Sequence, residues 1–281
     1  MSEIAVVSEV RSFGGTQGVY RHQSEALDCA MQFGVFIPPQ AEEAPVPVLY
    51  YLSGLTCTEE NFIVKAGAQQ FAAEQGLMLI APDTSPRGLD LPGEHDDWDF
   101  GSGAGFYLDA SQSPWQQNYR MHTYVVSELP ELCRVRFPMD PERVGITGHS
   151  MGGHGALSIA FAHPQRYRSL SAFAPIVAPT HCPWGEKAFS NYLGSDRETW
   201  RRWDACELVA KSGWKSPILV DQGAADPFLV EQLKPELLQK ACAEAGVPLE
   251  CRMHAGYDHS YFFIATFMQD HIEHHSRLLR A

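Results

Sequence analysis

The stretch "VGITGHSMGGHGAL", residues 144–157, decides the fold. An apolar, β-branched run leads directly to a serine between glycines, and small residues continue beyond it. This order predicts a strand, a sharp turn that carries Ser150, and a helix. The residue at such a turn is strained, and Gly148 and Gly152 remove side chains that would collide with neighbouring backbone. The pattern favours Ser150 as a nucleophile. The alternative is a glycine-rich turn with no chemical role.

The rest of the chain alternates between two kinds of apolar pattern. Seven β-rich runs predict strands, at 32–38, 47–54, 77–83, 143–149, 169–176, 217–223 and 249–256. Helical patterns lie between them, at 66–76, 119–137, 151–164, 229–246 and 261–279. This alternation predicts an α/β fold with a mostly parallel central sheet and helices on both faces. The strand-like runs near the start of the chain predict an antiparallel N-terminal edge.

No linker, repeat or low-complexity tract divides the chain, so we expect one domain over residues 1–281. Two segments, at about 83–115 and 178–215, lack a clear period and are predicted to be long irregular loops. Loops of that length inside a compact domain are usually functional.

Composition excludes several classes of partner. The formal net charge is −13, from 21 basic and 34 acidic residues, which argues against binding nucleic acid or an anionic membrane surface. Seven cysteines without a C-x-x-C pair argue against a disulfide scaffold or a zinc ribbon and favour a reducing compartment. The first residues do not resemble a signal peptide, and no apolar run approaches the roughly 18 residues of a membrane span. We therefore expect a cytoplasmic protein.

A serine nucleophile needs a base, and the base needs an acid to orient it. Behind an elbow of this kind the acid follows a later strand, and "ILVDQGAADPF" offers Asp221 and Asp226. Asp226 is preferred because it lies beyond the strand, where it can reach sideways. Of the later histidines, His259 lies in a short loop before the last helical pattern, and we predict that it is the base. The histidines set aside are His254, His271, His274 and His275.

The negative charge that develops during acyl transfer needs two backbone donors. One is the amide of Met151, the residue after the nucleophile. The other is expected in the loop after an early strand, and "YYLSGLTCTEEN" supplies that loop. We assign the second donor to the amide of Leu55.

Two other motifs are set aside. "GSGAGF", residues 101–106, lacks the third glycine of a dinucleotide fingerprint and the strand–turn–helix around it. "HIEHH", residues 271–275, puts two histidines four residues apart on one helix face, but no further ligand at a recognised spacing supports a metal site.

The motifs that carry the chemistry belong to a longer set, which runs from about residue 50 to the C-terminus. The set includes "YLSGLTCTEENF", "PDTSPRG", "WDFGSGAGFY", "GHSMGGHGAL", "PWGEKAF", "DQGAAD" and "GYDHSYFFIATF". In this order the chain resembles the S-formylglutathione hydrolase (esterase D) family. The resemblance implies an α/β-hydrolase fold and cofactor-free hydrolysis of S-formylglutathione to formate and glutathione, as in formaldehyde detoxification. It also implies the triad Ser150, Asp226 and His259, an oxyanion hole of the Leu55 and Met151 amides, and a homodimer.

The chain departs from the family locally, since Ala178 and Ala225 replace polar residues that are common in relatives. A formyl group needs only a narrow pocket beside the serine, so glutathione must be recognised by the long loops. Candidate substrate-binding residues are Cys57, Trp98, Phe106, Trp184 and Lys187.

Other functions remain open on the residues alone. A broad short-chain carboxylesterase would use the same groups, and so would an acyltransferase in which an alcohol or sugar replaces water. A hydrolase-like binding module without catalysis is the alternative from another class. Such modules typically lose a triad member, whereas all three residues are present here, so the sequence favours an enzyme.

Overall fold

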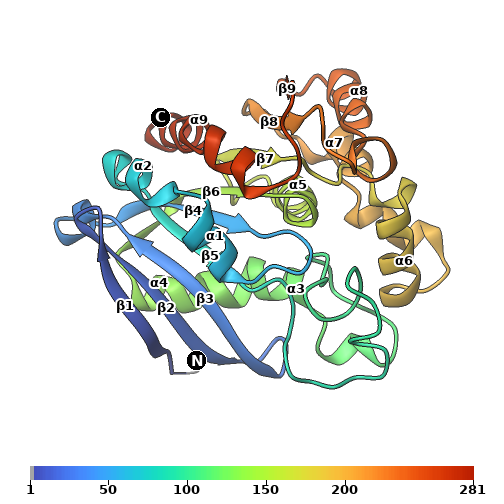
Figure 1. Cartoon of the computed structure of the whole chain (residues 1–281), viewed down its shortest axis with the longest axis horizontal. Coiled ribbons are helices and arrows are strands. Elements are labelled where there is room, and N and C mark those ends of the chain that lie inside the picture. The colour runs from blue at the N-terminus through green and yellow to red at the C-terminus, as the bar shows by residue number, and fades with distance from the viewer. Residues whose placement is uncertain (1–2) are drawn as a thin grey trace.

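A nine-stranded sheet forms the centre of the protein, for which a computed structural model describes residues 3–281 (Figure 1). The strands lie in the order β1-β2-β3-β5-β4-β6-β7-β8-β9. Their bounds are β1 Ala5–Ser12, β2 Gly15–Ser24, β3 Cys29–Ile37, β4 Val46–Leu52, β5 Met78–Pro82, β6 Met139–Gly148, β7 Ser169–Phe173, β8 Ile218–Gly223 and β9 Leu249–His254. Neighbours from β5 to β9 are parallel, whereas β1, β2, β3 and β5 pair antiparallel. The predicted parallel sheet and its antiparallel N-terminal edge are confirmed.

Helices cover both faces of this sheet, as the alternating pattern predicted (Figure 1). They are α1 Glu59–Lys65, α2 Ala68–Gln75, α3 Met121–Thr123, α4 Leu129–Arg136, α5 Met151–Ala162, α6 Pro183–Tyr192, α7 Ala205–Ser212, α8 Pro235–Ala245 and α9 Tyr261–Arg280. Helix α9 packs on α2 and along β6, β7 and β8, while α5 packs on β4, β6, β7 and α7. Within residues 3–281, no helix is long and apolar enough to cross a membrane.

Strand β4 illustrates why both faces must be covered. Successive side chains of a strand point to opposite faces, so Tyr50 and Tyr51 face different helices. The Tyr51 ring stacks on Phe62 of α1 at a centroid distance of 3.7 Å, whereas Tyr50 faces the side of α4. Both tyrosines are buried, and a strand buried on both faces requires the continuous apolar run seen in the sequence.

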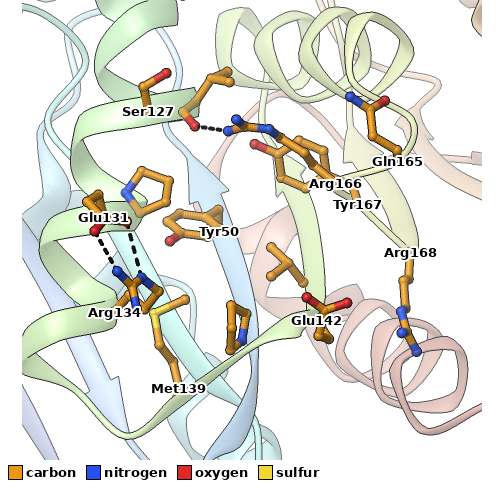
Figure 2. A pocket seen from close by; sticks show the side chains of 14 residues that line it. Tyr50, Ser127, Glu131, Arg134, Met139, Glu142, Gln165, Arg166, Tyr167 and Arg168 are labelled. Atoms are coloured by element: carbon orange, nitrogen blue, oxygen red, sulfur yellow. Dashed lines mark hydrogen bonds and ion pairs between the residues drawn. The ribbon is translucent and has the colours of Figure 1, made fainter.

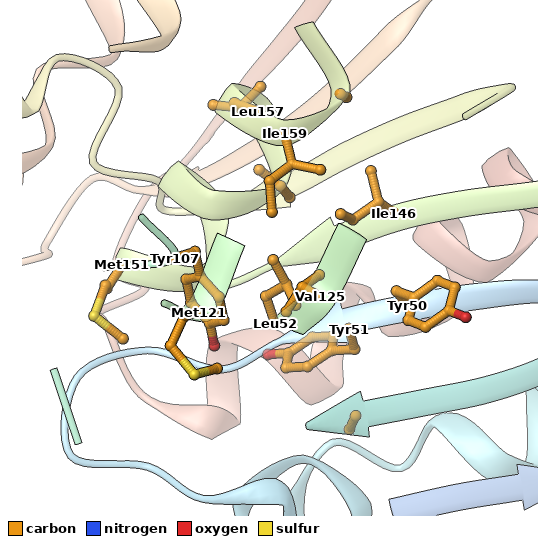
Figure 3. Close-up of a cluster of buried hydrophobic side chains, with 14 of the residues drawn as sticks. Tyr50, Tyr51, Leu52, Tyr107, Met121, Val125, Ile146, Met151, Leu157 and Ile159 are labelled. Carbon is orange, nitrogen blue, oxygen red and sulfur yellow. The ribbon is translucent and has the colours of Figure 1, made fainter. Parts of the chain in front are cut away.

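The core lies directly beneath the turn that carries Ser150. Figure 3 shows Leu52 of β4 and Ile146 of β6 beneath Leu157 and Ile159 of α5. All four side chains are completely buried. Truncating one such leucine to alanine typically costs about 2–5 kcal/mol, because the cavity left behind does not collapse fully. Close packing on both sides therefore holds the end of β6 and the start of α5 rigidly in place.

The structure differs from the expectation for residues 178–215, which are not an irregular loop. They contain α6, α7 and a 3₁₀ helix at Arg197–Trp203. Pro183 occupies the start of α6, and the Asp204 carboxylate caps α7 by accepting from the Cys206 amide at 2.9 Å. Both are recognised helix-start signals that could have been found in the sequence. The first long segment agrees with the prediction, since no strand or helix begins between β5 and Trp115.

Candidate active site

Ser150 lies at the sharp turn between β6 and α5. Its φ of 59° and ψ of −117° are strained for a residue with a side chain. A Cβ at Gly152 would overlap the Leu52 carbonyl oxygen, and one at Gly148 would overlap the carbonyl oxygen of Gly152. The turn therefore forms only when both positions are glycine, which is the physical reason for the G-x-S-x-G spacing. Packing energy from the surrounding core offsets the strain at the serine.

Asp226 and His259 come together from two loops beyond the carboxyl ends of β8 and β9. The Nδ1 atom of His259 lies 2.5 Å from Oδ2 of Asp226. The same carboxylate accepts from the Phe228 amide at 2.8 Å and from Nε2 of Gln222 at 3.2 Å, so its orientation is fixed. Because a carboxylate only accepts, Nδ1 of His259 carries the proton and Nε2 is left with a lone pair. This is the tautomer that a general base requires.

A contact between two imidazole rings, of His149 and His259, links the turn that carries Ser150 to the loop that carries His259. The ring of His149, the residue before Ser150, lies 4.3 Å from the ring of His259 between centroids. His149 is buried, and neither of its ring nitrogens has a hydrogen-bond partner among the described residues. Burial, together with the neighbouring His259, holds the pKa of His149 well below its usual value, so its ring is neutral. Sequence reasoning missed His149, although it is the variable residue of the elbow motif.

The other carboxylate that the sequence offered, Asp221, lies elsewhere. It is completely buried on β8 and forms a two-point ion pair with Arg252, with contacts of 2.5 and 2.6 Å. The Nε2 atoms of His254 and His271 also hydrogen-bond to this carboxylate, at 2.9 and 3.2 Å. Burial alone would raise the pKa of Asp221, but hydrogen bonds from Arg252 and His271 lower it strongly. Asp221 has no contact with His259, so its role is structural.

The remaining histidines of the last helix also face the sheet. His275 hydrogen-bonds to the hydroxyls of Ser169 at 2.6 Å and Ser171 at 2.8 Å, and His274 bonds to the Leu170 carbonyl oxygen at 3.1 Å. Within residues 3–281, no group of three or more histidine, cysteine, aspartate or glutamate side chains is arranged to hold a metal ion. These rings hold α9 on the sheet.

The two expected oxyanion donors lie in the two segments next to Ser150. A Cβ built on Gly54 would be 3.1 Å from the Ser150 Cβ, so the loop that carries Leu55 lies directly against the serine. Met151 is the first residue of α5, whose N-terminus carries partial positive charge. Among the described residues, neither the Leu55 nor the Met151 amide donates to a protein acceptor. Two unengaged amides in segments next to a serine are suited to stabilising an oxyanion.

Aromatic side chains lead from the surface to His259. Trp98, which is 57% exposed, meets Trp184 at a ring distance of 5.7 Å. Trp184 contacts Phe228 at 4.7 Å, and Phe228 contacts His259 at 5.1 Å. The sequence suggested both tryptophans but not Phe228. Its position two residues beyond Asp226 could have indicated it.

The other substrate-binding candidates are placed less favourably. The Phe106 side chain is completely buried, with His154 and Phe189 as ring neighbours, so it does not line a surface rim. That expectation is wrong, because the glycine-rich segment folds inward. The ammonium of Lys187 forms ion pairs with Asp97 at 2.8 Å and Asp99 at 2.6 Å, so carboxylates of the protein already neutralise it.

Cys57 is partly buried in the oxyanion-donor loop. Burial raises the pKa of its thiol, although Lys65 nearby opposes this shift. The thiol is therefore protonated near neutral pH, and a protonated thiol is a weak nucleophile.

A surface cavity of about 540 Å³ lies away from these residues. It is at the amino end of β6, between α4 and the turn before β7, and Figure 2 shows Tyr50 at its centre with Arg134 and Arg166 on its walls. Arg134 pairs with Glu131, and Arg166 donates to the Val126 carbonyl. The candidate active site is thus located by its chemistry and not by cavity size.

Comparisons with known proteins place the chain in an esterase family. The sequence model of the Esterase family matches residues 24–274, which include every site residue above. The chain is 56% identical to the mouse S-formylglutathione hydrolase over 98% of each chain, and 55% identical to that of Paracoccus denitrificans over 97% of each. The solved structure of an S-formylglutathione hydrolase from Agrobacterium tumefaciens matches with a TM-score of 0.96 and 50% identity, over 98% of this chain and 99% of that one. The chain belongs to the S-formylglutathione hydrolase family. Its sheet and helices are those of the α/β-hydrolase fold of that family.

Proposed function

We propose that the chain hydrolyses S-formylglutathione to formate and glutathione through a formyl-serine intermediate. Two findings support this. Relatives with that name are more than half identical over nearly the whole length, and Asp226 contacts His259 at 2.5 Å in the tautomer that a base needs. The contact is the observation that carries the chemistry, because a serine hydroxyl is a poor nucleophile without such a base.

The reaction uses groups of this chain at each step. His259 Nε2 takes the proton of Ser150 Oγ as that oxygen attacks the formyl carbon. The amides of Leu55 and Met151 stabilise the oxyanion. The carbon–sulfur bond then breaks, and His259 returns its proton to the departing glutathione thiolate. Water, deprotonated by His259, attacks the formyl-serine; the ester bond breaks, His259 returns the proton to Ser150 Oγ, and formate is released. Asp226 stabilises the imidazolium in both halves.

Recognition of the leaving group is assigned to the exposed ring of Trp98 and to the buried Trp184 beneath it. Glutathione carries two carboxylates and an ammonium, while the protein carries a net charge of −13, so binding depends on local contacts. Asp97 and Asp99 already compensate the charge of Lys187, which makes it a weak anion site. Cys57, two residues after Leu55 in the same loop, is assigned to the wall of the acyl pocket.

The test compares three thioesters on the purified protein. We expect kcat/KM for S-formylglutathione to exceed that for S-acetylglutathione by at least about 10-fold, because one added methyl group meets the pocket wall. A formyl thioester of a simple thiol should also be slower. Equal rates on all three would favour a broad carboxylesterase. A fluorophosphonate probe that fails to label Ser150 in the folded protein would favour a non-catalytic module.

We also propose a homodimer, a cytoplasmic location and one domain over residues 1–281. All seven cysteines are unpaired, which fits a reducing compartment, and all nine strands belong to one sheet. Edge strand β1 carries three half-exposed valines, Val6, Val7 and Val10, and a second copy of the chain would cover them. Sedimentation of Val10→Lys tests this, with Val135→Lys as a control of the same 60% exposure on α4. A wild type that sediments as a monomer excludes the dimer.

A further inference from the structure

The loop that carries Leu55 has an unusual set of supports. Residues on either side of Leu55 are bound by the long segment that follows β5. The Tyr107 hydroxyl donates to the Ser53 carbonyl at 2.9 Å, and the Thr56 amide donates to the Gly103 carbonyl at 2.9 Å. Thr56 has a φ of 67°, which a β-branched residue adopts only when its surroundings hold it there. The position of the Leu55 amide is therefore imposed from outside its own loop.

Arg87 joins these supports together. Its Nη2 atom donates to the Cys57 carbonyl at 3.0 Å and to Oδ1 of Asp83 at 2.7 Å. Its Nε atom reaches Oδ2 of Asp83 at 3.1 Å, and Nη1 reaches the Ser102 hydroxyl at 3.2 Å. One planar guanidinium thus connects three segments, at 57, 83 and 102, in a geometry that the point charge of a lysine does not reproduce.

The glycine-rich motif "GSGAGF", which does not fit a dinucleotide fingerprint, acquires a role in this arrangement. Gly103 has a φ of 80°, and a Cβ there would lie 3.1 Å from the Thr56 Cα and 3.5 Å from Nη1 of Arg87. Its amide donates to the Ser85 hydroxyl at 2.7 Å. The motif is glycine-rich because its backbone packs directly against the oxyanion-donor loop and the guanidinium.

From these contacts we propose that Arg87 is a positioning residue for the oxyanion hole, which it serves by holding the Cys57 carbonyl and, through Ser102 and Gly103, the Thr56 amide. The inference rests on the proposed role of the Leu55 amide. Arg87 touches no reacting atom. It fixes the loop so that Leu55 points at the developing oxyanion before substrate binds, and such preorganisation lowers the barrier without changing ground-state binding.

The chain offers a matched control for this residue. Arg143 is 33% exposed in its side chain, against 34% for Arg87. It pairs with Asp140 at 2.6 Å and donates to the Pro45 carbonyl at 3.2 Å, as Arg87 pairs with Asp83 and donates to Cys57. Arg143 lies in the amino half of β6, whereas Ser150 follows the carboxyl end of that strand. The two arginines therefore share exposure, ion pair and carbonyl contact but differ in what they hold.

The experiment measures kcat, KM and inhibition by a trifluoromethyl ketone, which forms a tetrahedral adduct with the serine, using an activated aryl acetate as substrate. Losing an oxyanion donor completely costs about 10²–10³-fold, so a loosened donor in Arg87→Gln should lower kcat/KM roughly 10- to 100-fold. The effect should fall on kcat with KM nearly unchanged, and affinity for the ketone should fall in parallel. Arg143→Gln should match the wild type.

Arg87→Lys keeps the charge beside Asp83 and should be intermediate; it carries the test if Arg87→Gln does not fold. An Arg87 variant that folds and stays within twofold of the wild type overturns the proposal. A loss confined to KM, or a loss of kcat without weaker ketone binding, overturns it as well. The aryl acetate makes the test of Arg87 independent of the proposed substrate. A protein that does not hydrolyse S-formylglutathione but hydrolyses the acetate still shows whether Arg87 positions the oxyanion hole.

Discussion

Asp221 and Asp226 lie five residues apart in the same short stretch, yet they do different work. Asp221 points into the sheet and is neutralised by the Arg252 guanidinium. Asp226 lies beyond the strand, and its side chain, equally buried, faces the imidazole of His259. The charge of a carboxylate paired with a permanent cation is already compensated. A carboxylate that faces an imidazole can instead stabilise the positive charge that develops when the imidazole takes a proton. We propose that position, and the partner that this position gives each carboxylate, assigns the catalytic role to Asp226.

The largest expected effect comes from neutralising the acid of the pair. Asp226→Asn should lower turnover by about 10⁴-fold, because an asparagine amide no longer selects the tautomer in which Nε2 of His259 is free. Circular dichroism and the melting temperature should stay close to those of the wild type. A well-folded Asp226→Asn protein with more than a tenth of wild-type turnover would contradict the assignment.

The reverse pattern is expected at Asp221. Asp221→Asn leaves the Arg252 guanidinium and the buried His271 ring without their carboxylate. Breaking a buried ion pair costs on the order of 3 kcal/mol, reduced here because Arg252 is 28% exposed. Urea titration should show this loss, while turnover per folded molecule stays near wild type. If Asp221→Asn were inactive but as stable as the wild type, Asp221 and not Asp226 would be the catalytic acid.

Buried histidines that contribute to stability and not to catalysis should make the free energy of unfolding depend on pH. Burial lowers the pKa of His154 and His274 to about 4, whereas these rings in an unfolded chain titrate near 6.5. Between those values the unfolded chain binds more protons, so stability falls as pH drops from about 6.5 toward 4. Each ring should cost on the order of 2 kcal/mol at pH 5. Melting temperatures at pH 5 and pH 7 measure this, and His274→Gln should show a shallower drop.

The smallest expected effect tests whether an unpaired Asp221 can replace the acid. Arg252→Gln removes the cation from Asp221 and should destabilise the protein moderately. In an Asp226→Asn background it should restore no activity, because Asp221 has no contact with His259. Recovery of turnover in the double variant would show that the partner, and not the position, excludes Asp221 from catalysis.

Much of the candidate site was predictable because it depends on local backbone chemistry. The strained turn at Ser150 can form only with glycines at 148 and 152, and this requirement is visible in the sequence within two residues of the serine. The order of serine, acid and histidine follows from strands whose carboxyl ends meet at one edge. Helix α8 shows the opposite case, since the predicted helix at 229–246 is interrupted at Lys234, which has a φ of 51° before Pro235.

The sequence by itself determined the sheet, the elbow at Ser150 and the limited choice of acid and base, because periodicity and turn chemistry act over a few residues. Only the tertiary structure decided that Arg252 forms an ion pair with Asp221 and that Lys187 forms ion pairs with two aspartates. It also decided that the Phe106 side chain is buried. It also decided that Arg87 holds a loop 30 residues earlier in the chain. These contacts form only when distant segments pack together. A charged group then pairs with the oppositely charged group that packing brings near it, and the local sequence does not specify which one that is.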